Sequence, residues 1–114
     1  FPIFHALSQP GHRYLFDKFV VNLRRTGSPE ESNPMGLFEF YVDLNSQEAA
    51  IEVKARELEL KDLLQRTIED ETHYDLQGER GKERVKDLIR EELNKVLTRG
   101  WVEDVYISNM VLNP

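Results

Sequence analysis

The residues that could carry out chemistry are few and scattered. The three histidines are His5, His12 and His73, and none has the spacing of a metal-binding motif. Because the chain has no cysteine, a zinc site would need carboxylate ligands. One acidic group surrounds the third histidine and could in principle meet a divalent cation: Asp70, Glu71, His73 and Asp75. The favoured interpretation is the solvated, polar end of a helix, so no metal and no cofactor is expected.

Two further patterns do not meet the requirements of the chemistry they suggest. The segment GERGK, Gly78 to Lys82, superficially resembles a phosphate-binding loop, but it lacks the Walker spacing and does not follow a strand. The serines lack the strand-to-helix context of a nucleophilic serine; they are Ser8, Ser28, Ser32, Ser46 and Ser108. The sequence therefore predicts a protein that is not an enzyme.

The composition indicates one small domain. The chain has 114 residues, 39% hydrophobic and 32% charged, with a formal net charge of −6, which fits a single globular domain with a modest core. An acidic chain lacks the clustered Lys and Arg that bind phosphate backbones, so nucleic acid is not an expected partner. No run approaches the roughly 18 to 20 apolar residues of a membrane-spanning helix. Because the chain begins at Phe1 and not at methionine, a leader or an upstream part is expected to be missing.

The elements that must position these side chains begin with two expected strands. Tyr14 to Leu23 is rich in β-branched and aromatic residues, and Thr26 to Gly36 is a polar connection with two glycines and two prolines. From Gly36 to Asn45 the side chains alternate with a period of two, which is typical of a half-buried strand. Phe38, Phe40, Val42 and Leu44 fall on one face, and Leu37, Glu39, Tyr41 and Asp43 on the other.

Two helices are expected between Ser46 and Arg99, where most of the charged residues lie with their signs interleaved. Ser46 is the expected N-cap of a long first helix, Asp75 to Gly81 breaks the run, and Gly100 is expected to end the second helix. The second helix follows from an apolar stripe: Val85, Leu88, Ile89, Leu93, Val96 and Leu97. Acid-before-base pairs four residues apart should support both helices: Glu52/Arg56, Glu57/Lys61, Asp62/Arg66 and Glu91/Lys95.

A third strand is expected after Gly100, so the order is strand, strand, helix, helix, strand. This order predicts an α+β fold: a small antiparallel or mixed sheet, three-stranded or slightly larger, with two helices packed on one face. Phe16, Phe19, Phe38, Phe40 and Tyr106 are predicted to be core, and Trp101 to be core or partly exposed.

The first 13 residues are interpreted as a lead-in, and residues 14–114 as the single domain. The lead-in contains two prolines and an apolar group that a small core has little room to absorb. An exposed apolar patch there would mark a partner surface or a membrane-proximal segment. The candidates are Phe1, Ile3, Phe4 and Leu7.

Several segments together resemble the FliL family of flagellar basal-body-associated proteins. FVVNL (Phe19 to Leu23) and FEFYVDLN resemble its first two strands. LKDLLQRTIEDETHYDL (Leu60 to Leu76) and GKERVKDLIREELNKVL (Gly81 to Leu97) resemble its helical segments, and GWVEDVYISNMVLN its closing strand. The resemblance covers roughly Tyr14 to Leu112. The chain departs from the family where a helix turn usually marked by Arg-x-Pro reads RELELKD.

The resemblance implies a periplasmic domain of a single-pass inner-membrane protein at the flagellar basal body, with the anchor upstream of Phe1. It further implies a fold like the stomatin/prohibitin (SPFH) domain, assembly into rings, and association with stator units in support of torque and motility. The charged helix faces are the candidate oligomer surface, with these residues: Glu52, Arg56, Glu57, Lys61, Glu91 and Lys95. The alternatives are a stomatin/prohibitin-like membrane scaffold not tied to the flagellum, and a small cytosolic enzyme or ligand-binding domain with a deep pocket.

Overall fold

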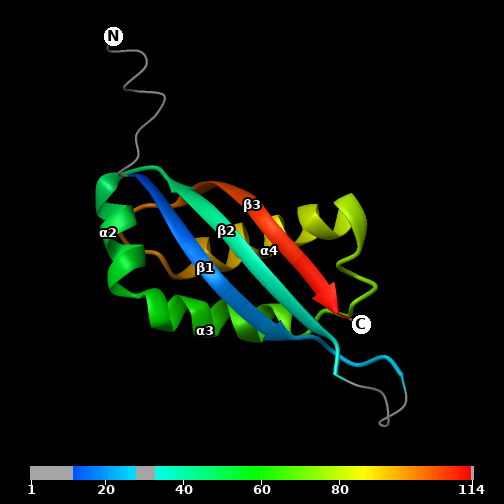
Figure 1. Ribbon diagram of the computed structural model, residues 1–114. Coiled ribbons are helices and arrows are strands. Elements are labelled where there is room, and N and C mark those ends of the chain that lie inside the picture. The colour runs from blue at the N-terminus through cyan, green and yellow to red at the C-terminus, as the bar shows by residue number, and fades with distance from the viewer. Residues whose placement is uncertain (1–11, 28–32, 114) are drawn as a thin grey trace.

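The computed structural model describes residues 12–27 and 33–113 and has the predicted α+β architecture. Its elements in chain order are β1 (Arg13–Asn22), β2 (Met35–Leu44), α2 (Gln47–Ala55), α3 (Glu57–Ile68), α4 (Gly78–Val96) and β3 (Val102–Asn113). The three strands form an antiparallel sheet in the order β1-β2-β3. The described helices lie on one face of this sheet, and none of them covers the other face (Figure 1).

The core lies between the sheet and the helices. Four phenylalanines from β1 and β2 are at most 1% exposed: Phe16, Phe19, Phe38 and Phe40. Phe16 stacks on Phe40 with ring centroids 5.0 Å apart. The helices contribute the buried side chains Val53, Leu60, Leu64, Ile68, Val85, Ile89 and Leu93. The alternation predicted for β2 is confirmed, because its four predicted inward residues are all buried.

A bulge in β1 keeps two phenylalanines on the same face. Phe16 pairs with Phe40 and Phe19 with Phe38, so β1 uses one more residue than β2 over this stretch. Two residues three apart would otherwise point to opposite faces. Lys18, inside the bulge, takes a φ of +52°, which is uncommon for a residue other than glycine. The bulge therefore turns an irregular sequence pattern into a continuous apolar face.

The long first helix predicted from the sequence is wrong, because the structure has two helices there and three in the described part of the chain. α2 ends and α3 begins at Arg56, whose backbone has φ −107° and ψ 21°. Neither proline nor glycine occupies this point, so the local sequence gave no break signal. Ser46 is the N-cap of α2 as predicted, since its side chain accepts a hydrogen bond from the amide of Ala49.

The predicted end of the second helix is also wrong. α4 ends at Val96, with Leu97 as its C-cap, and Gly100 lies in the connection to β3. A Cβ atom at Gly100 would lie 2.3 Å from Oδ1 of Asn45 and 2.8 Å from Cβ of Ala49. Gly100 is thus required by the close approach of this connection to the start of α2, and not as a helix terminator.

The prediction of Tyr106 as core is wrong, since 43% of it is exposed on the helix-free face of the sheet. Trp101, predicted to be core or partly exposed, is 55% exposed just before β3. Within the described segments, no helix is both long and apolar enough to cross a membrane.

Candidate functional site

The residues predicted to form an oligomer surface lie on all three helices. Glu52 is on α2, Arg56 stands between α2 and α3, Glu57 and Lys61 are on α3, and Glu91 and Lys95 are on α4. The structure connects the α2–α3 junction to the end of α4, because Nη1 of Arg56 donates to the carbonyl of Val96 at 2.9 Å.

Three of the four predicted ion pairs are present. Glu52 and Arg56 are 2.6 Å apart, Glu57 and Lys61 3.6 Å apart, and Asp62 and Arg66 3.1 Å apart. The fourth prediction is wrong in its partner, since Lys95 pairs with Glu92 at 2.5 Å rather than with Glu91. The pairs other than Glu52/Arg56 are exposed or half-buried, so each contributes little to stability on its own.

Glu52 differs from the other five because it is buried. Its carboxylate accepts hydrogen bonds from the amides of Thr98 and Arg99, the hydroxyl of Thr98 and the guanidinium of Arg56, at 2.6–3.0 Å. Burial alone would raise the pKa of Glu52, but these hydrogen bonds together lower it below the usual value for glutamate. Glu52 therefore acts first as the anchor of the α4–β3 connection.

Arg56 uses its whole guanidinium group at the α2–α3 junction. Nε and Nη2 donate to the two carboxylate oxygens of Glu59 at 3.1 and 2.6 Å. Nη1 donates to the carboxylate of Glu52 and to the carbonyl of Val96. The hydrogen bonds to Glu59 and Glu52 raise the pKa of Arg56, so the group stays protonated. The site thus joins α2, α3 and the carboxyl end of α4 through one side chain.

A shallow groove of about 510 Å³ runs beside this network. It is lined by Glu48, Ile51, Glu52, Ala55, Arg56, Thr98 and Arg99. Ile51 is 61% exposed, and it precedes Glu52 in the chain. This groove places an exposed apolar side chain beside charged groups.

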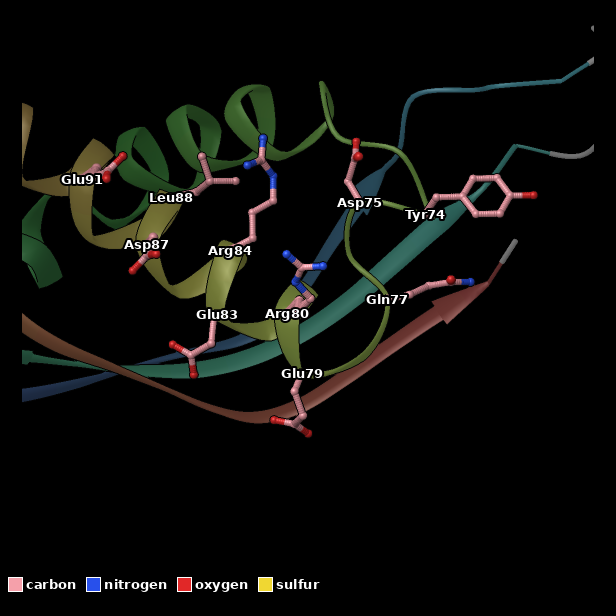
Figure 2. Close-up of a pocket in the computed structure, with 10 residues that line it drawn as sticks. All are labelled: Tyr74, Asp75, Gln77, Glu79, Arg80, Glu83, Arg84, Asp87, Leu88 and Glu91. Carbon is pink, nitrogen blue, oxygen red and sulfur yellow. The ribbon is translucent and has the colours of Figure 1, made fainter.

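A second hollow lies between the α3–α4 connection and the outer side of α4, with a volume of about 770 Å³ (Figure 2). Its lining is mostly charged: Tyr74, Asp75, Gln77, Glu79, Arg80, Glu83, Arg84, Asp87, Leu88 and Glu91. In Figure 2 the side chain of Tyr74 points away from the helix, and Glu79 and Glu83 point away from the connection. The hollow is wide and charged, unlike the mostly apolar, enclosing pockets that bind small molecules.

The acidic group around His73 is divided among separate structural contacts. The carboxylate of Glu71 pairs with Arg84 of α4, and one oxygen of Asp75 accepts from the amide of Thr72 at 2.9 Å. Nδ1 of His73 lies 3.1 Å from the side-chain amide of Gln77. Across residues 12–27 and 33–113, no three His, Asp or Glu side chains are grouped so that they could hold a metal ion. GERGK forms the first turns of α4.

Several predicted residues lie outside the described part of the chain. They are the apolar lead-in candidates Phe1, Ile3, Phe4 and Leu7, together with His5, Ser8, Ser28 and Ser32. The role of the four lead-in residues as a partner surface remains a prediction.

Sequence reasoning missed the apolar rows on the helix-free face of the sheet. Two apolar rows cross it, in which Leu15 pairs with Tyr41 and Tyr41 with Tyr106, while Val20 pairs with Leu37 and Leu37 with Val111. At the end of the face, Arg13 pairs with Asp43 at 2.7 Å and lies 5.1 Å from the ring of Tyr106. The alternation in β2 could have revealed these apolar rows, because Leu37 and Tyr41 fall on the face opposite to the core residues.

Comparison with known proteins identifies a family for this chain. A family model described as flagellar basal body-associated protein FliL matches residues 14–112. The chain is also similar to the flagellar protein FliL of Bacillus subtilis (strain 168), with 28% identity over 71 residues, which is 62% of this chain and 51% of that protein. The match thus spans about half the length of this relative. Because the family match runs from β1 through β3, the chain belongs to the FliL family of flagellar basal-body-associated proteins.

Proposed function

We propose that this chain is the periplasmic domain of a flagellar motor accessory protein that associates with stator units and supports torque and motility. The observation that carries the proposal is the family match over residues 14–112, which makes the chain flagellar basal-body-associated. The proposed topology is a single-pass inner-membrane protein with its anchor before Phe1. The lead-in residues Phe1, Ile3, Phe4 and Leu7 are the proposed membrane-proximal or partner contacts.

The proposed mode of action is a scaffold, with copies of the domain arranged in a ring in the manner of stomatin/prohibitin domains. The proposed ring contact uses the charged helix faces, with Glu57, Lys61, Glu91 and Lys95 offering exposed or half-exposed charges. Glu52 and Arg56 would support this contact indirectly, because their charges already serve the α2–α3 junction. Solvated ion pairs are individually weak, so the ring contact should be sensitive to salt.

Electron microscopy of the anchored protein in mild detergent tests the assembly. We expect closed rings from the wild type and fewer from a charge swap, Glu57→Lys with Lys61→Glu, which keeps the pair within α3 but reverses its pattern. The matched control is Asp62→Arg with Arg66→Asp, a second exposed pair on the same helix. Discrete monomers from the wild type, or equal loss in both swaps, would contradict the proposed ring contact.

The association with stator units is tested separately in a flagellated host. We expect the tagged protein to co-purify with stator units, and its deletion to reduce swimming most strongly in viscous medium, where the load on the motor is high. Normal swimming at every viscosity in the deletion strain would overturn the motor role without bearing on the ring.

A further inference from the structure

The strand β3 forms one margin of the sheet, and its outer edge has no neighbouring strand within residues 12–27 and 33–113 (Figure 1). An edge strand presents unpaired backbone N–H and C=O groups to any strand that approaches it, and natural proteins usually block such edges. The two edges of this sheet differ in how they are blocked.

The edge at β1 carries several of the usual blocking features. Its bulge holds Lys18 at a positive φ, which interrupts the regular spacing of the ladder groups. The side-chain amide of Gln65 on α3 donates to the carbonyl of Val20 at 3.0 Å, so the helix already occupies part of this edge. A further strand could not add along β1 without displacing these contacts.

The edge at β3 also has a bulge, at Ser108, but among the described residues its outer backbone groups meet a side chain only at the start of the strand. The side chain of Asn94 on α4 both accepts from the amide of Val102 and donates to its carbonyl, at 2.6 and 3.2 Å, as a neighbouring strand would. From Val105 to Asn113 the strand contains no charged residue and no proline. Lys, Pro and inward-pointing charges are the common guards of a free edge. Most of β3 therefore lacks them.

The side chains of β3 are arranged symmetrically about its centre. A bulge at Ser108 lets Ile107 and Met110, three residues apart, pair with the buried residues Phe40 and Phe38. Both are half-buried at the margin of the core, as is Leu112. On the helix-free face, Tyr106 and Val111 occupy the two apolar rows described above. On either side of the polar pair Ser108 and Asn109 comes first a core-side apolar residue and then an exposed apolar residue.

We propose that β3 pairs antiparallel with β3 of a second copy of this chain, with the two-fold axis between Ser108 and Asn109, to form a six-stranded sheet. In this register Ile107 faces Met110 of the partner copy, Val105 faces its Leu112, and Tyr106 faces its Val111. Each pair lies on one face, as directly opposed residues of antiparallel strands must. Asp104 faces Asn113 of the partner copy, so no two carboxylates are opposed.

A second copy fits this edge because the pattern complements itself. An isologous pair requires that each residue meet a suitable partner from the same surface, which this register provides at every apolar position. The pair also joins two helix-free faces into one larger face. It does not depend on stator units or on the ring, since a two-fold contact joins the same surface of both copies, whereas a ring contact joins two different surfaces.

Cysteine cross-linking tests the register, because the native chain contains no cysteine. In Tyr106→Cys with Val111→Cys the two sites on one strand are about 15 Å apart, too far for a disulfide within the chain. Mild oxidation should therefore give a covalent dimer. The matched control is Leu15→Cys with Val20→Cys, which occupies the same two rows on the opposite edge and should stay monomeric. No dimer from the β3 variant, or equal dimer from both variants, would overturn the proposal.

Sedimentation velocity over a concentration series tests the interface without cross-linking. We expect a monomer–dimer equilibrium whose Kd rises at least about tenfold in Val111→Lys, since a lysine guards the edge. Val20→Lys places the same charge in the same row on the β1 edge, at similar exposure of 41% against 43%, and should leave the Kd unchanged. A wild type that stays monomeric up to millimolar concentrations, or equal weakening by both lysines, would overturn the pairing. Circular dichroism confirms that each variant is folded.

Discussion

The carboxylate of Glu52 accepts hydrogen bonds from both the amide and the hydroxyl of Thr98, at 3.0 and 2.9 Å, although the two residues are 46 positions apart in the chain. This contact fixes the α4–β3 connection onto α2. Because Gly100 then passes close to Asn45 and Ala49, the same contact helps to set where β3 enters the sheet.

Glu52→Gln should weaken the fold at neutral pH and change its response to acid. A carboxylate that accepts this many hydrogen bonds contributes more than an amide can, so we expect a loss of about 1–3 kcal/mol in the free energy of unfolding. Because the folded pKa of Glu52 is lowered, its contribution is present above the unfolded pKa and is lost as the pH falls through the folded pKa.

Urea denaturation at a series of pH values measures both effects. Below about pH 4.3, the ordinary pKa of glutamate, wild-type stability should fall more steeply than that of Glu52→Gln. The control is Glu48→Gln, an exposed glutamate one turn earlier on α2. Parallel curves for the wild type and Glu52→Gln would contradict the assignment.

Arg56→Lys should destabilise the junction although it keeps the positive charge. One ammonium cannot span Glu52, Glu59 and the carbonyl of Val96 as the planar guanidinium does. We expect a loss of about 1–2 kcal/mol in the free energy of unfolding, read from the urea midpoint at constant slope. Arg66→Lys on α3, where the arginine forms a single exposed ion pair, should change it little. Equal losses at the two positions would mean that the planar guanidinium of Arg56 is not needed at the junction.

Gly81→Ala should be far more damaging than Gly78→Ala. A Cβ atom at Gly81 would lie 1.9 Å from the carbonyl oxygen of Leu76, a backbone atom that cannot move freely, whereas Gly78 has open space around it. Gly78 has a φ of +69°, so alanine there costs only the backbone strain of about 1–2 kcal/mol. Thermal unfolding should rank wild type above Gly78→Ala and Gly81→Ala last. The reverse order would contradict the packing of α4 on its preceding turn.

Asn94→Ala should loosen the start of β3 without unfolding the domain. The substitution removes both hydrogen bonds to Val102, and the expected cost is about 0.5–1.5 kcal/mol for each because the site is partly solvated. Hydrogen exchange at the Val102 amide should accelerate, while exchange at amides in the centre of β2 should follow only the small global change. Unchanged protection at Val102 would show that another group satisfies this amide.

The sequence predicted the strands well because their signals are local. The alternation Phe38, Phe40, Val42 and Leu44 and the cap at Ser46 each depend on neighbouring residues, and all appear as predicted. The break at Arg56 could not be predicted in this way, because it is stabilised by contacts with Glu52 and with Val96, which lies 40 residues away.

The exposure of Tyr106 has a similar cause. A strand rich in apolar residues indicates burial, but the side on which each residue falls depends on bulges that arise only when β3 pairs with β2. For the same reason Glu52 was predicted as a surface charge from its helical spacing, while its burial depends on the distant amides of Thr98 and Arg99.

The strand order has a mechanical consequence. β1 and β3 run in the same direction on either side of β2, so Arg13 and Asn113 lie at opposite ends of the sheet, roughly 30 Å apart for strands of this length. A pull between these two points would slide both outer strands along β2. The force would then be shared by many ladder hydrogen bonds at once, instead of opening them one at a time. The sheet is therefore expected to resist tension that is applied along its strands.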